Sequence, residues 1–112
     1  MTKIDVIIDD AFQLNYQSSN TERTLFLAVI LQALLDATKP EYQGEPEQVE
    51  LDRRQAKAWF SASVGVTAQD FVDVCDLAGV DPEYTRQFAF KILESKEVNF
   101  VRKRINTLLT NK

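Results

Sequence analysis

The sequence predicts an all-α fold, a compact bundle of about five helices that contains a helix-turn-helix. Apolar residues recur at helical spacing along most of the 112 residues. Helix-start and helix-stop residues separate these segments, and only three Gly and three Pro interrupt them. With 45% hydrophobic residues, the chain is long enough to bury one core. We expect a poorly defined segment over residues 1–18 and a single helical domain over residues 19–112.

The first eighteen residues have the weakest pattern. Residues 4–8 fit a short strand, whereas residues 11–14 fit a turn of helix. Because Asp5, Asp9 and Asp10 interrupt any apolar stretch, no signal peptide is expected.

The first helix is predicted over residues 20–38. Ser19 and Glu22 have the spacing of a capping box, and ten of the eleven residues from Leu25 to Leu35 are apolar. This run is too short to span a bilayer, which takes about 20 residues. A helix that is apolar all round belongs in the centre of a bundle or at a subunit interface.

An exposed loop and a second helix follow. Residues 39–47 contain two of the three prolines and have no periodicity, which predicts the loop. The aromatic pair Trp59–Phe60 fits a base-stacking platform or the core, and we favour the core. The helix is expected over about residues 49–62, with one face formed by Leu51, Gln55, Ala58, Trp59 and Ala62.

Two short helices joined by a tight glycine turn are predicted over about residues 68–93. Thr67 and Asp70 have the spacing of a helix cap at the start of the first helix. Gly79 ends that helix, since glycine adopts positive φ at little cost, and Asp81 and Pro82 begin the next one. The expected buried positions are Phe71, Val74, Cys75 and Ala78 on the first helix and Tyr84, Thr85, Phe88, Ala89 and Ile92 on the second.

Residues 75–88 resemble the helix-turn-helix of bacterial and phage transcription regulators. Cys75 is the small residue four positions before the turn glycine, and Val80 and Phe88 match two of the hydrophobic positions after it. Thr85 stands where Val or Ile is usual. More widely, residues 24–93 resemble small uncharacterised proteins of tailed phages. The resemblance implies a DNA-binding protein, with transcription regulation as the expected function.

If residues 82–93 form a recognition helix, its outward side chains meet base edges in the major groove. Arg86 suits guanine, Gln87 suits adenine, and Glu83 can accept from cytosine. Contacts to phosphates are expected from the remaining basic side chains, namely Lys91, Lys96, Arg102, Lys103 and Arg104.

The net charge of −4 is distributed unevenly. From Arg86 to the end, the chain has seven basic and two acidic residues, a net charge of +5, whereas the first 85 residues carry −9. A basic C-terminal quarter is typical of a surface for a polyanion, or of a solvated helix face. Asp70, Asp73 and Asp76 oppose the DNA interpretation, because they line the outer face of the first motif helix and repel phosphate. Phe90 on the supposed DNA face also fits packing better.

The last helix is expected over residues 97–109. Val98, Val101, Ile105 and Leu108 form a seam that suits a docked terminal helix or a dimer contact. We expect a homodimer on double-stranded DNA, held by this seam or by the apolar run of residues 24–37. One alternative is a factor that binds a host protein through an acidic face, formed by Asp70, Asp73 and Asp76 with Glu45, Glu47 and Glu50. A second alternative is a packaging component such as a terminase small subunit.

The sequence favours no enzyme activity, metal site or cofactor. It contains no His, and its only Cys lies on an apolar stripe, which favours a small buried side chain over a nucleophile. Paired carboxylates such as Asp9–Asp10 fit solvated faces better than a Mg²⁺ site. No segment fits a membrane helix, so we expect a cytoplasmic protein, located in the host cytoplasm if a phage encodes it.

Overall fold

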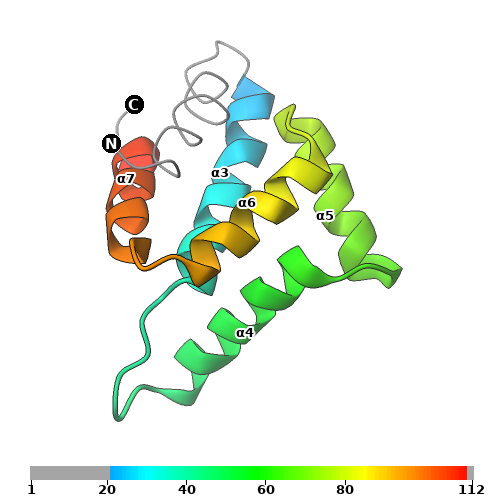
Figure 1. Cartoon of the computed structure of the whole chain (residues 1–112). Helices are drawn as coiled ribbons and strands as arrows, with labels where there is room; N and C mark the ends of the chain where they lie inside the picture. The colour runs from blue at the N-terminus through cyan, green and yellow to red at the C-terminus, as the bar shows by residue number, and fades with distance from the viewer. Residues whose placement is uncertain (1–20, 111–112) are drawn as a thin grey trace.

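Five helices make up the part of the chain that the structure, a computed structural model, describes, residues 21–110 (Figure 1). They are α3 (Thr21–Ala37), α4 (Glu47–Ser61), α5 (Gly65–Ala78), α6 (Pro82–Glu94) and α7 (Val98–Thr110). These residues contain no strand, so the predicted all-α bundle is confirmed. The expectations for residues 1–18 and for a cap at Ser19 concern residues outside the described range.

Helix α3 occupies the centre of the bundle, as its apolar sequence predicts. It packs against α4, α5 and α7, and Figure 1 shows α5 and α7 on opposite sides of it, with α6 crossing in front. Leu27, Ile30 and Leu34 are fully buried. Because the three neighbours leave part of its circumference uncovered, Leu25 is 61% and Val29 42% exposed.

Helix α4 lies where the sequence predicts a helix, but it buries a different face. Phe60 is fully buried and Arg53 is 4% exposed. Gln55 and Ala58, which the sequence places on the inward face, are exposed, and Trp59 is half-buried. The prediction of a core aromatic pair therefore holds for Phe60, whereas Trp59 borders the surface.

The inward position of Arg53 is explained by the loop between α3 and α4. Its Nε donates to the carbonyl oxygen of Lys39 at 2.8 Å, and its guanidinium pairs with the Glu45 carboxylate at 2.7 Å. The hydrogen bond between Arg53 and Glu45 lowers the pKa of Glu45 and raises the pKa of Arg53. One buried cation thus fixes a loop that has two prolines and no helical pattern.

The α5–α6 pair has the predicted turn. Gly79 ends α5 at a φ of +76°, and the Asp81 side chain accepts from the backbone N–H of Tyr84 at 2.7 Å. The predicted cap by Thr67 and Asp70 is wrong. Gly65, at a φ of +90°, already begins α5 two residues earlier, so both side chains lie within the helix.

Burial along α5 and α6 follows the predicted stripes with one exception. Tyr84 is 40% exposed, because it lies in the first turn of α6 at the edge of the stripe formed by Thr85, Phe88, Ala89 and Ile92. Thr85 is fully buried, and its hydroxyl donates to the Asp81 carbonyl at 2.8 Å. This hydrogen bond satisfies the hydroxyl that a buried threonine brings into the core.

Helix α7 docks on the bundle along the predicted seam. Val101 and Ile105 are fully buried and Leu108 is 7% exposed, in contacts that include α3 and α6. The seam therefore packs within the chain rather than remaining available to a second copy. Within residues 21–110, no helix has the length and apolar character needed to cross a membrane.

Candidate functional site

The residues assigned to DNA from the sequence fall into two groups in the structure. Five are exposed: Glu83, Gln87, Lys91, Lys96 and Lys103. Three arginines are instead half-buried: Arg86, Arg102 and Arg104. The contacts of Arg86 and Arg102 decide how much positive charge the C-terminal quarter presents to a partner.

Arg86 binds the C-terminal end of α4. Its Nε donates to the carbonyl oxygen of Phe60 at 2.9 Å, and a terminal nitrogen donates to that of Ala62 at 3.2 Å. The guanidinium also lies over the Phe71 ring, 5.1 Å from its centroid, and pairs with Glu83 at 3.4 Å. The prediction that Arg86 points away from the buried stripe is therefore wrong.

Arg102 likewise donates hydrogen bonds at the C-terminal end of α3. One terminal nitrogen donates to the carbonyl oxygen of Leu35 and, at 2.9 Å, to the Thr38 hydroxyl. Burial lowers the pKa of Arg102, and the negative charge of Asp36 opposes that shift. The side chain is thus half-buried and bound to the C-terminal end of α3.

Both arginines supply hydrogen-bond donors to a helix C-terminus that has no basic residue of its own. The last turn of a helix leaves carbonyl oxygens without partners and carries a partial negative charge, which basic side chains stabilise. Neither α3 nor α4 has a basic residue in its own last turn. The cations therefore come from α6 and α7, which pack against these helices in the folded chain.

The outward charge of the α5–α6 pair is consequently acidic. Over residues 65–94, Lys91 is the one exposed cation. Six carboxylates of the same segment are exposed: Asp70, Asp73, Asp76, Asp81, Glu83 and Glu94. A surface with this balance repels a phosphate backbone and attracts a basic partner.

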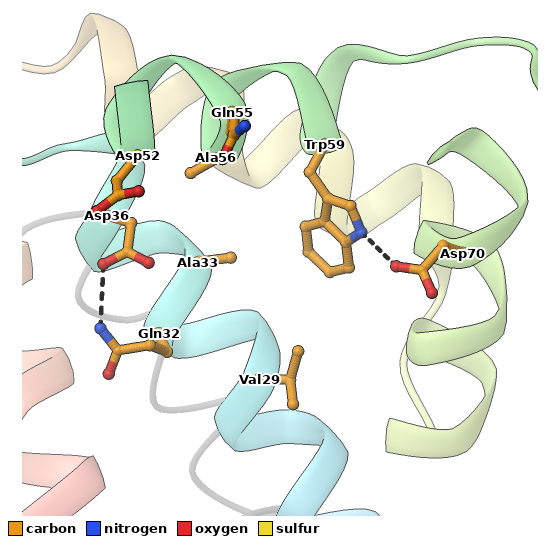
Figure 2. Close-up of a pocket in the computed structure, with 9 residues that line it drawn as sticks. All are labelled: Val29, Gln32, Ala33, Asp36, Asp52, Gln55, Ala56, Trp59 and Asp70. Carbon is orange, nitrogen blue, oxygen red and sulfur yellow. Dashed lines mark hydrogen bonds between the residues drawn. The ribbon is translucent and has the colours of Figure 1, made fainter. Parts of the chain in front are cut away.

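A groove of about 460 Å³ lies between α3, α4 and α5 (Figure 2). Its centre is apolar, formed by Val29 and Ala33 from α3 and by Ala56 and Trp59 from α4. Acidic side chains lie at both ends in Figure 2, with Asp36 and Asp52 at one end and Asp70 beyond the indole at the other. The lining is completed by Gln32 and Gln55.

Trp59 and Asp70 are joined by a hydrogen bond at one end of the groove. The indole Nε1 donates to Oδ2 of Asp70 at 2.8 Å. The ring packs edge-to-face with Phe60 and Phe71, at centroid distances of 5.1 and 5.0 Å. Because both aromatic neighbours are fully buried, the core fixes the orientation of the indole.

The three groove carboxylates are held by neutral donors rather than by cations. Asp36 accepts from Gln32 at 3.2 Å and Asp52 accepts from Gln48 at 2.8 Å. Within residues 21–110 no basic group lies within 4.0 Å of them to form an ion pair, although Asp36 contributes to the field at Arg102. The groove therefore has uncompensated negative charge next to exposed apolar surface.

The groove differs from the acidic face that the sequence predicts. Glu45 is bound to Arg53, and Asp73 is exposed on α5 but does not line the groove. Asp36 and Asp52 were missed, because nothing local connects residues on two different helices. Each follows a glutamine by four residues, a spacing typical of an exposed helix face, but Asp73 outside the groove has the same spacing, so it does not single them out.

Two further candidate chemistries have no support in the described range. Burial raises the pKa of the Cys75 thiol to about 11, so this side chain stays protonated and packs in the core. Among residues 21–110, no group of three His, Cys, Asp or Glu side chains converges as metal ligands. Comparisons of the chain with protein-family models, with curated proteins and with solved structures each return no match.

Proposed function

We propose that the chain is a protein-binding factor that docks a basic segment of a partner protein in the groove between α3, α4 and α5. The observation that carries this proposal is the groove itself, with an apolar centre and three carboxylates that form no ion pair within residues 21–110. An amphipathic basic segment matches both features, since its apolar side chains cover the centre and its cations meet the ends.

The internal hydrogen bonds of Arg86 and Arg102 support a basic partner rather than a nucleic acid. Arg86 and Arg102 are engaged with helix carbonyls, and the exposed carboxylates of α5 and α6 outnumber the exposed lysine. Electrostatic attraction between an acidic groove and a basic segment speeds association and weakens as salt rises. The proposal therefore expects salt-sensitive binding of basic peptides.

The test compares two probes at low salt. One is an amphipathic helical peptide with a leucine face and a basic face, and the other is a double-stranded DNA oligonucleotide. Trp59 is the only tryptophan, so its fluorescence reports directly on the groove. We expect the peptide to change this fluorescence saturably and the DNA to be bound weakly or not at all. The triple variant Asp36→Asn/Asp52→Asn/Asp70→Asn is expected to weaken peptide binding by at least about tenfold, or about 1.4 kcal/mol.

A matched control separates the groove from net charge. The variant Asp73→Asn/Asp76→Asn/Asp81→Asn removes the same number of carboxylates from the outside of the groove. Asp81 caps α6, but asparagine also serves as a cap, so the helix is expected to remain. If the two triple variants weaken the peptide equally, attraction is non-specific and the groove is not the docking site.

DNA binding is the second candidate, and the geometry of the α5–α6 pair favours it. Two helices meet at a tight glycine turn, with Gln87 and Lys91 exposed on the second. The variant Gln87→Ala/Lys91→Ala tests reading of DNA without disturbing the fold, whereas Arg86→Ala would also release α4. A low-salt gel shift that this surface variant abolishes, without any peptide binding, would replace the first proposal with the second.

A further inference from the structure

We infer that the Trp59–Asp70 end of the groove is a subsite for one arginine side chain of the partner, with selectivity over lysine. This inference rests on the proposed function and adds the identity of the anchoring residue. It follows from three features. The core fixes the orientation of the Trp59 indole, and only one oxygen of the Asp70 carboxylate accepts a hydrogen bond within residues 21–110. The chain also contains a contact between a guanidinium and the neighbouring Phe71 ring.

The indole and the carboxylate offer two complementary surfaces for a guanidinium. Trp59 is half-buried, and its uncovered surface lines the groove. Oδ2 of Asp70 accepts from the indole Nε1, while Oδ1 has no hydrogen-bond donor within residues 21–110. A planar guanidinium stacks on an aromatic ring and donates to a carboxylate at the same time, whereas an ammonium group acts as a point charge.

A related contact between a guanidinium and an aromatic ring exists next to Trp59 within the chain. The Arg86 guanidinium stacks over Phe71 at 5.1 Å, and Phe71 in turn packs against Trp59 at 5.0 Å. Trp59 is therefore the outer member of an aromatic cluster whose inner member already binds an arginine. A partner arginine would extend this cluster by one layer, with Asp70 as its counter-ion.

The other end of the groove determines the form of the partner segment. Asp36 and Asp52 line it, and small side chains of Ala33 and Ala56 lie between them and the indole. Small side chains on the floor let a helix backbone approach closely. The occupant is thus an amphipathic helix of a partner protein, with an arginine at Trp59 and a second basic residue of either type toward Asp36 and Asp52.

The experiment titrates the full chain with two helical peptides that are identical except that one carries arginine and the other lysine. Fluorescence of Trp59 gives both affinities at low salt. We expect the arginine peptide to bind about five- to tenfold more tightly. In Asp70→Asn, where the amide oxygen can still accept from the indole, this preference is expected to fall below about twofold.

Asp73→Asn is the matched control, because it removes one carboxylate from the same helix outside the groove. Like Asp36 and Asp52, Asp73 accepts from a glutamine four residues earlier, so its local surroundings are comparable. We expect this variant to weaken both peptides slightly and equally. Circular dichroism of each variant checks the fold, and Trp59→Leu, measured by calorimetry, is expected to lose the preference independently of Asp70.

The outcomes separate the inference from the function on which it rests. If neither peptide affects Trp59, both the docking proposal and the arginine subsite are wrong. If both peptides bind equally and Asp70→Asn behaves as Asp73→Asn, docking stands and the arginine subsite is refuted. A preference that survives in both Asp70→Asn and Trp59→Leu would place the arginine elsewhere and overturn the assignment.

Discussion

The basic C-terminal quarter and the acidic groove have opposite charges and use them in different ways. In the C-terminal quarter, Arg86 and Arg102 donate to carbonyl oxygens at the ends of α4 and α3. In the groove, Asp36, Asp52 and Asp70 accept from neutral side chains and form no ion pair within residues 21–110. Charges of the first kind stabilise the fold, whereas charges of the second kind remain available to a partner.

This difference shows why charge counted along the sequence misrepresents the surface. The segment from Arg86 onward carries +5, and this favours a site for a polyanion. Removing Arg86 and Arg102 from the count leaves the half-buried Arg104 and three exposed lysines as the basic side chains of this segment within the described residues, namely Lys91, Lys96 and Lys103. The outward charge of a helical protein depends on which long side chains serve as caps for distant helices.

The largest expected effect is on Arg86. Arg86→Ala removes two charge-assisted hydrogen bonds to the end of α4 and the stack on Phe71, and we expect a loss of about 2–3 kcal/mol of unfolding free energy. Urea denaturation measures it, and Lys91→Ala on the exposed side of the same helix is expected to cost less than about 0.5 kcal/mol. Equal losses for both variants would contradict the structural role of Arg86.

A smaller effect is expected at Arg102. Arg102→Ala leaves the Leu35 carbonyl and the Thr38 hydroxyl without this donor, at a cost of about 1–2 kcal/mol in unfolding free energy. The neighbouring Lys103 is exposed, so Lys103→Ala is the control, with a change within about 0.5 kcal/mol. If Arg102→Ala is neutral and instead abolishes DNA binding, the arginine is a phosphate contact after all.

The smallest expected effect at neutral pH concerns Glu45, and it has a distinct pH dependence. Arg53 lowers the pKa of Glu45 in the folded chain below its ordinary value of 4.5. The stability from this pair is therefore fully present above that value and is lost as the pH falls through the lowered folded pKa. Glu45→Gln should lower the melting temperature at neutral pH and converge with the parent protein in acid.

Thermal melts at several pH values measure the Glu45 effect. Glu47→Gln, an exposed glutamate in the first turn of α4, provides the control for a simple change of charge. A constant difference between Glu45→Gln and the parent protein across the acid range would mean that the pair with Arg53 does not titrate as the structure indicates.

Most of the fold follows from local sequence signals. The buried stripe of Phe71, Val74, Cys75 and Ala78 and the turn at Gly79 are confirmed, because helical spacing and a positive φ are properties of a few adjacent residues. The error at the start of α5 is local, because Gly65 begins the helix two residues before Thr67. The error on the face of α4 has a tertiary origin, because carbonyls of the preceding loop turn Arg53 inward.

Local sequence places the five helices and the buried stripes of α3, α5, α6 and α7, since apolar periodicity and capping act over one or two turns. It does not place the buried face of α4. Which charges remain on the surface depends instead on how the helices pack against one another. Arg86 and Arg102 turn inward because the ends of α4 and α3 lack basic residues of their own, 24 to 67 residues away along the chain. Asp36, Asp52 and Asp70 form one site because three helices meet there, which no local pattern encodes.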